Sequence, residues 1–95
     1  MEFDWDPHKA LENLRKHRVS FDEAATVLGD LLAMTVPDPD HSFEESRFLT
    51  VGLSDQNRLL IVSHAERDSR YRIISARELT RMERKAYETA RYRFN

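Results

Sequence analysis

The sequence predicts a small α+β domain in which two helices precede an antiparallel sheet and one helix follows it. Three observations support this fold class. The chain has 95 residues, enough for one domain with one modest core. Its first part has helical spacing, whereas the part after Gly29 has the short apolar runs of strands. A helix-start signature then recurs near residue 75, so we expect a single domain over residues 1–95, in the order β-α-α-β-β-β-β-α.

The first predicted elements are a short strand and a helix. Residues 2–5 alternate polar and apolar side chains, as a short strand does. Asp6 followed by Pro7 is typical of an N-cap and a first helical position, so a helix should run from there to about His17. Its inward-facing residues are expected to be Ala10, Leu11 and Leu14.

A second helix is predicted from Ser20 to the stop at Gly29. Ser20 and Glu23 form a capping box, and Val19 is placed to pack against Ala24 as a hydrophobic staple. Its apolar stripe consists of Phe21, Ala24, Ala25 and Leu28.

Four more strands follow from the alternation of residues and from the turns between them. They are residues 33–36, 47–53, 59–65 and 71–74. A proline-rich acidic turn at 37–40 ends the first of them. The run at 59–65 is almost continuously apolar, which predicts a central strand buried on both faces.

The last helix is predicted to open with a second capping box, formed by Ser75 and Glu78. One side of this helix should carry the apolar residues Leu79, Met82, Ala86 and Ala90. The opposite side should carry Arg77, Arg81, Arg84 and Arg91.

Composition excludes several classes of protein. The absence of cysteine excludes disulfides, thiolate catalysis and cysteine-based zinc sites. No apolar run reaches the roughly 18 residues of a membrane helix, and residues 1–6 do not resemble a signal peptide. We therefore expect a cytoplasmic domain that does not enter a membrane.

The net charge of −2 conceals an uneven distribution. Residues 1–46 have four basic and eleven acidic side chains, a balance of −7, whereas residues 47–95 have eleven basic and six acidic ones, a balance of +5. Such asymmetry indicates an anionic partner for one surface. The alternative is that folding interleaves the two halves into a mixed, soluble surface.

The motifs resemble those of the BrnT-type toxins. The opening of that family is similar to Trp5-Asp6-Pro7-x-Lys9, to Asn13-Leu14-Arg15-Lys16-His17 and to Val19-Ser20-Phe21-x-Glu23-Ala24. Its closing signature resembles Arg72-Ile73-Ile74-Ser75-Ala76-Arg77 and Glu83-Arg84-x-x-Tyr87. The family usually has glycine where Arg18 stands, so the connection after the first helix is expected to be built differently.

The resemblance implies a RelE-like fold, a small antiparallel sheet flanked by helices. It also implies a type II toxin that cleaves RNA and arrests translation. The implied partner is a BrnA-type antitoxin with a ribbon-helix-helix portion, in an assembly of two toxins and two antitoxins. That complex would bind operator DNA through the antitoxin and repress its own promoter.

Cleavage of RNA without a metal needs a base, an acid and fixed positive charge around the phosphate. The candidate acid–base residues are His64, Glu66, Lys16 and His17, with Tyr87 as a further possibility. Arginine can supply the fixed positive charge, because its planar guanidinium group binds phosphate through two hydrogen bonds. The candidates are Arg72 and Arg77 at the catalytic centre and Arg47, Arg67 and Arg81 for binding RNA. Arg77 is included because a cation in the first turn of a helix opposes the helix dipole.

Each of these residues also has a structural interpretation. His64 could be a core histidine satisfied by a neighbour, and Tyr87 a packing residue. Arg81 could belong to a solvated face, and the Lys16-His17 pair could serve only the helix dipole. Asp38, Asp40 and His41 could be taken for a metal cluster, but no fourth ligand is spaced nearby, so no metal and no cofactor is expected.

Two hypotheses of function remain in competition. The first is a ribonuclease toxin with the site above. The second is a non-catalytic or degenerate toxin-fold module that binds the antitoxin and tunes autorepression. The overall acidic charge favours the second hypothesis, and the arginine-rich second half favours the first.

Overall fold

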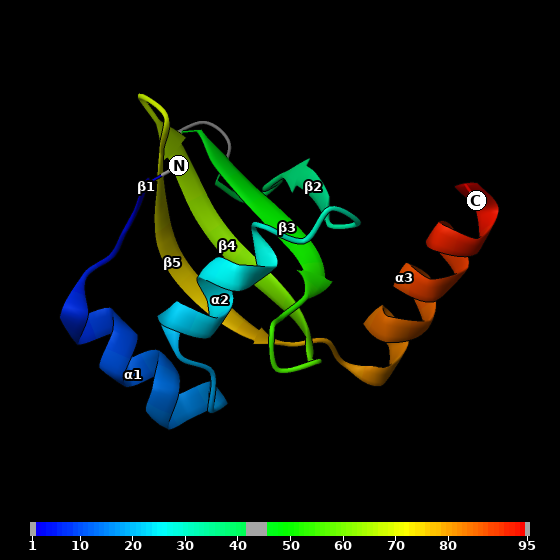
Figure 1. Cartoon of the computed structure of the whole chain (residues 1–95), viewed down its shortest axis with the longest axis horizontal. Helices are drawn as coiled ribbons and strands as arrows, with labels where there is room; N and C mark the ends of the chain where they lie inside the picture. Colours follow the sequence, from blue (N-terminus) through cyan, green and yellow to red (C-terminus); the bar gives the residue numbers. More distant parts are fainter. Residues whose placement is uncertain (1, 42–45, 95) are drawn as a thin grey trace.

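In the computed structural model, which describes residues 2–41 and 46–94, a five-stranded sheet is covered on one face by two helices, while a third helix stands at its side (Figure 1). The mixed α+β class is confirmed. The elements are β1 (Glu2–Asp4), α1 (Pro7–His17), α2 (Phe21–Val27), β2 (Met34–Pro37), β3 (Arg47–Leu53), β4 (Leu59–Arg67), β5 (Arg70–Glu78) and α3 (Arg81–Phe94). None of the helices in the described ranges is long and apolar enough to cross a membrane.

The strands are arranged in the order β1-β5-β4-β3-β2. Three of the four pairings are antiparallel, as predicted. The exception is β1, which pairs parallel to β5 with Phe3 opposite Tyr71, and the two rings stack at 5.9 Å. The expectation of a wholly antiparallel sheet is therefore wrong at this edge, because the chain passes through both helices and three strands before β5 returns beside β1.

The core lies between the sheet and the first two helices. Its fully buried members are Val19, Phe21, Ala24, Val27, Leu60, Val62, Ile73 and Ala76. Trp5 packs edge-on against Phe21 at 5.9 Å between ring centres, which fixes the entry into α1. Ser20 accepts a hydrogen bond from the Glu23 amide at 3.0 Å, as the predicted capping box requires.

The side chain of Glu23 does not complete that box. It is buried and pairs with Arg58, whose Nε lies 2.9 Å from Oε2, and it also accepts a 2.7 Å hydrogen bond from Ser54. The hydrogen bond from Arg58 holds the pKa of Glu23 below its usual value, although burial acts in the opposite direction. This pair ties α2 to the turn between β3 and β4.

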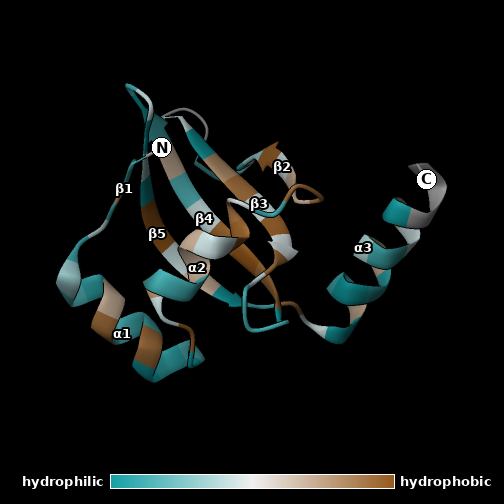
Figure 2. Cartoon of the chain, in the orientation of Figure 1, coloured by the Kyte–Doolittle hydropathy of each residue, from teal (hydrophilic) through white to brown (hydrophobic). Residues whose placement is uncertain are grey.

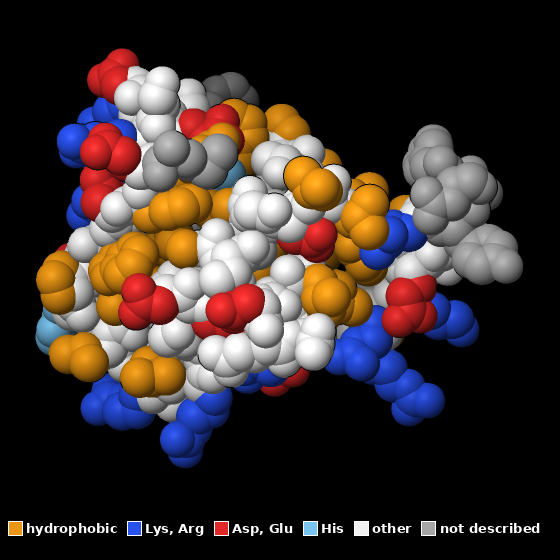
Figure 3. All heavy atoms as spheres, in the orientation of Figure 1, with side chains coloured by type: hydrophobic (Ala, Val, Ile, Leu, Met, Phe, Trp, Pro, Cys, Tyr) orange, Lys and Arg blue, Asp and Glu red, His pale blue; other side chains and the backbone are white. Residues whose placement is uncertain are grey.

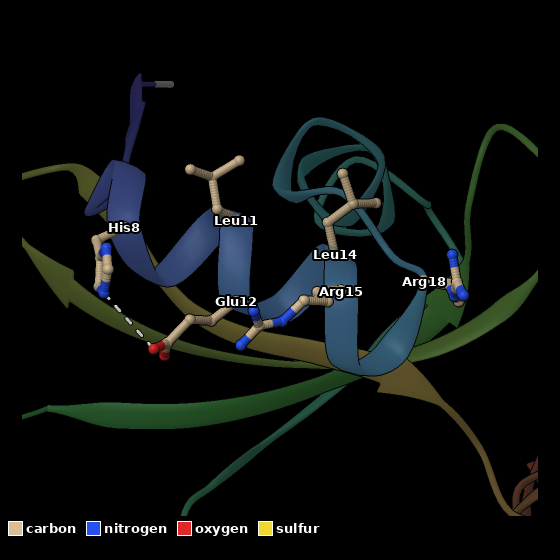
Figure 4. Close-up of a pocket in the computed structure, with 6 residues that line it drawn as sticks. All are labelled: His8, Leu11, Glu12, Leu14, Arg15 and Arg18. Carbon is tan, nitrogen blue, oxygen red and sulfur yellow. Dashed lines mark ion pairs between the residues drawn. The ribbon is translucent and has the colours of Figure 1, made fainter.

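The inward face of α1 differs from the predicted one. Leu11 and Leu14 are exposed, Leu11 by 68%, and their side chains point away from the strands beneath the helix (Figure 4). The buried residue is Asn13. Its amide nitrogen donates to the carbonyl oxygens of Val19 at 2.9 Å and Ala76 at 2.8 Å, and its oxygen accepts from the Ala76 amide at 3.1 Å. Asn13 thus takes the place of a neighbouring strand at the edge of β5.

Arg18 ends α1 in the left-handed conformation, with φ 60° and ψ 30°. Its amide donates to the Leu14 carbonyl at 2.9 Å, the usual bond of a left-handed C-cap. The connection is therefore of the kind that glycine would make, and it is not built differently as the missing glycine led us to expect. A non-glycine residue in this conformation costs about 1 kcal/mol.

The last strand is longer, and the last helix starts later, than predicted. β5 pairs with β4 as far as Glu78 opposite Leu60, so Ser75 and Arg77 are strand residues. The capping box is formed instead by Thr80 and Glu83, whose amide and side-chain groups exchange hydrogen bonds of 2.9 and 3.2 Å. Both Ser75-x-x-Glu78 and Thr80-x-x-Glu83 could cap a helix, and the pairing of β5 with β4 leaves the second as the cap of α3.

α3 stands away from the body of the domain and is largely hydrophilic (Figures 1 and 2). The predicted apolar stripe does not hold for Met82, which is 84% exposed, or for Ala86, which is also exposed. Leu79 is buried but precedes the helix, and among the α3 residues whose burial the structure describes, Tyr87 is the buried one.

Candidate functional site

One face of the sheet is not packed against α1 or α2. We call it the open face. It is defined by strand residues that alternate with the core residues, because successive side chains point to opposite sides of a sheet. On the helix side lie Leu60, Val62 and Ile73, so Ile61 and Ser63 of β4 point to the open face and are only half-buried. The predicted burial of this strand on both faces is therefore wrong within the described residues.

Three arginines reach the open face through the strand register. Arg47 of β3 and Arg72 of β5 lie at the same level, on either side of Ala65. Arg77 lies further along β5, opposite Ile61. These arginines were predicted to belong to one site, and the register of the sheet puts them on one surface.

Two adjoining cavities lie on the open face, and Arg47 lines both of them. The first has a volume of about 420 Å³, and its polar lining includes His17, Asp38, Asp40, His41, Arg47, Ser63, Ser75 and Arg77. The second has a volume of about 520 Å³, and its charged lining includes Asp4, Lys9, Arg47, Arg67, Arg70 and Arg72. His17 arrives from the last turn of α1, so the structure joins it to the arginines as expected.

The arginines of β5 are held by carboxylates of the same chain. Arg72 Nη1 lies 3.1 Å from Asp4 Oδ1, and Arg70 Nε lies 3.1 Å from Glu2 Oε2. These side chains are 43–72% exposed, so such ion pairs are weak and exchange readily with other partners.

Arg77 has a tighter partner in α3. Its Nη1 and Nη2 lie 2.7 and 2.9 Å from the two carboxylate oxygens of Glu83, a two-bond fork. The hydrogen bond from Arg77, together with the Thr80 amide, lowers the pKa of Glu83 to about 2, and the same contact raises the pKa of Arg77. This fork fixes the first turn of α3 against the end of β5.

His64 lies on the opposite side of the sheet from these arginines. It is 1% exposed, stacks on Phe48 with ring centres 6.0 Å apart, and lies edge-on to Tyr71 at 5.4 Å. Its Nε2 is 2.7 Å from Thr50 Oγ1, which is in turn 2.7 Å from Thr35 Oγ1. Its Nδ1 is buried without a hydrogen-bond partner among the described residues. Burial lowers the pKa of His64 to about 4, so it is a neutral core histidine near pH 7 and does not reach the open face.

The other predicted residues are dispersed. Glu66 lies opposite Tyr71 on the helix side of the sheet. Burial raises the pKa of Tyr71, and the nearby carboxylate of Glu66 raises it further. Lys16 is exposed on α1 outside both cavities. Arg81 is exposed at the start of α3. Tyr87 is buried, and its hydroxyl has no partner within the described part of the chain.

Sequence reasoning missed two polar residues of the first cavity, Ser63 and Ser75, and it considered His41 only as a possible metal ligand beside Asp38 and Asp40. The alternation of strand residues would have placed the two serines, because Ser63 and Ser75 are opposite one another and share the parity of Arg77 and Ile61. Among the described residues, no three acidic or histidine side chains are grouped as metal ligands are.

From the helix side, basic side chains gather along the lower border and around α3, while acidic ones lie in the middle of this face and, mixed with basic ones, at its upper-left corner (Figure 3). Acidic and basic side chains are thus mixed on this side of the molecule.

Comparison with known proteins identifies the family. A family model described as "Ribonuclease toxin, BrnT, of type II toxin-antitoxin system" matches residues 5–83. The chain belongs to the BrnT family. The match extends from Trp5 to Glu83 and so includes every arginine and histidine lining the two cavities.

The BrnT assignment agrees with the fold. The 1.1 Å crystal structure of the Brucella abortus ribonuclease toxin BrnT matches with a TM-score of 0.67 and 21% sequence identity, over 85% of this chain and 99% of that chain. No curated protein matches the sequence. As a BrnT-family member, the chain is the toxin of a type II pair, so it has an antitoxin as its partner.

Proposed function

We propose that the chain is a metal-independent endoribonuclease that cleaves RNA on the open face of its sheet and thereby inhibits translation. The observation that carries this proposal is the convergence of Arg47, Arg72 and Arg77 with His17 on adjoining cavities of one face. Guanidinium groups spaced along a surface bind successive phosphates, and one beside the scissile phosphate stabilises the charge of the transition state.

The acid and base in this proposal are His17 and His41, which line the same cavity as Arg47 and Arg77. One imidazole accepts the proton of a ribose 2′-hydroxyl while the 2′-oxygen bonds to phosphorus. The other gives a proton to the departing 5′-oxygen as its bond to phosphorus breaks. The products are a 2′,3′-cyclic phosphate and a 5′-hydroxyl. His64 is left out because it is buried on the other face, and Lys16, Glu66 and Tyr87 lie outside both cavities.

The uncovered face of a small sheet flanked by helices supports the RelE-like assignment that the motifs suggested. With it we propose a BrnA-type antitoxin containing a ribbon-helix-helix portion, two toxins and two antitoxins in the complex, and repression of the promoter through the antitoxin. The cytoplasm, where RNA is translated, is then the place of action.

The test is RNA cleavage by the purified toxin, paired with growth of cells that express it without antitoxin. We expect arrest of growth, and cleavage that EDTA does not prevent. Arg72→Ala and His17→Gln should each lower kcat/KM by about 10²-fold with the fold intact. Arg15→Ala is the matched control, because Arg15 is exposed on α1 away from both cavities. Intact RNA with folded wild-type protein would refute the proposal.

A second candidate function is a non-catalytic module that binds the antitoxin. The observation in its favour is that Arg72 and Arg77 already bind Asp4 and Glu83 of the same chain. In that case the wild-type protein would be harmless at high expression, and the His17→Gln variant would behave as the wild type does.

A further inference from the structure

The open face has an apolar half that the proposed chemistry does not use. It consists of residues on β2, β3 and β4 that share one side by register. They are Met34, Val36, Leu49, Val51, Leu53, Leu59 and Ile61. Val36 is 50% exposed and Leu53 43%, although both are large hydrophobic side chains. An antiparallel sheet that faces water normally presents polar residues on that side.

This apolar half adjoins the arginines. Leu49 lies two residues from Arg47 on β3, and Ile61 lies opposite Arg77. Leu49 and Ile61 also line the first cavity together with those arginines. One continuous surface therefore combines aliphatic side chains at its β2–β3 side with guanidinium groups at its β5 side.

We infer that this whole face is the docking surface for the antitoxin, and that it takes a segment with an apolar stripe for β2 and β3 and carboxylates for the arginines. The inference uses the antitoxin partner that membership of the family implies, and it adds to the proposed function the surface by which the toxin is neutralised.

Charge complementarity selects this occupant over the other two that could lie there. RNA would satisfy the arginines, but the aliphatic residues offer no aromatic ring on which bases stack. A second copy of this chain, paired through the same face, would set arginines against arginines. An acidic amphipathic segment satisfies both halves at once.

The ion pairs already present on this face show which groups it accepts. Glu83 binds Arg77 through both carboxylate oxygens, and Asp4 binds Arg72. Both pairs are exposed by a third or more, so carboxylates from a partner can replace or extend them. The segment would then cover the cavity with His17 and exclude RNA.

The experiment measures the Kd of the antitoxin encoded with this toxin for variants of the purified toxin. Val36→Lys and Leu53→Lys place a charge in the apolar half and touch none of the proposed catalytic residues. We expect each to raise the Kd at least tenfold while the rate of RNA cleavage by the toxin alone stays unchanged. Val36→Met keeps the apolar surface and should bind as the wild type does.

Leu11→Lys is the matched control, since Leu11 is also an exposed leucine but lies on α1. Thermal melting of each variant shows that the fold is kept. Wild-type affinity in both Val36→Lys and Leu53→Lys, or a loss of affinity in Leu11→Lys alone, overturns the inference. If the wild type binds antitoxin but cleaves no RNA, the ribonuclease proposal fails while the docking result stands.

Discussion

His64 makes the stability of this domain depend on pH between about 4 and 6.5. In the folded protein its pKa is about 4, because burial disfavours the imidazolium, whereas an unfolded chain has the ordinary value of 6.5. The unfolded state therefore binds a proton at a pH where the folded state does not. Stability is complete above pH 6.5, falls as the pH decreases, and becomes constant again below 4 as far as His64 is concerned.

The size of this effect follows from the pKa difference. A shift from 6.5 to about 4 corresponds to about 3 kcal/mol in total. About 2 kcal/mol of it should be lost between pH 7.5 and 5, before the carboxylates with lowered pKa values, Glu23 and Glu83, begin to titrate. The 1% exposure of His64 leaves little solvent to reduce this figure.

Urea denaturation at a series of pH values between 7.5 and 5 measures this slope. His64→Gln keeps an amide near Thr50 and cannot be protonated, so the variant should be less stable at pH 7.5 but should lose much less stability on acidification. His8→Gln is the control, because His8 is exposed on α1 and should keep the wild-type slope. An equal slope in His64→Gln and the wild type would refute the assignment to His64.

Two further predictions concern α1. Asn13→Ala should lower the free energy of unfolding by about 2–4 kcal/mol in urea denaturation, because it removes three buried hydrogen bonds and leaves the amide and carbonyl of Ala76 without a partner. A loss below 1 kcal/mol would show that water replaces the amide of Asn13. Arg18→Gly should raise the melting temperature by a few degrees, through a gain of about 1 kcal/mol at its positive φ, whereas Arg18→Ala should give no gain.

Local signals in the sequence predicted the class and succession of elements well. Asp6-Pro7 and Ser20-x-x-Glu23 each mark a helix start that the structure contains, because capping depends on residues close in the chain. The start of α3 was misplaced because Ser75 could cap a helix or pair with Ser63, and only the long-range pairing decides.

The site was predicted less completely, since it depends on which face each strand residue occupies. Arg47, Arg72 and His17 were found by residue type, whereas Arg77 was included for a helix position that it does not occupy, since it lies in β5. His64 was favoured because it lies near the end of an apolar strand, and the same apolar context buries it on the helix side. His64 is two residues from Val62 and four from Leu60, so the alternation along the strand already indicates that it shares their side of the sheet.

The hydrogen bonds between Asn13 and Ala76 also bear on which strand edges of the sheet remain open to other molecules. β5 is longer than its neighbour β1, so part of its backbone would otherwise be an unpaired edge that could add strands from other molecules. The amide of Asn13 occupies that edge at Ala76. At the far side, β2 is only four residues long and ends in Pro37, which lacks an amide hydrogen. The apolar face is thus bordered by a strand edge that Asn13 partly occupies and by a short edge strand that ends in proline, and both features disfavour the addition of strands from other molecules.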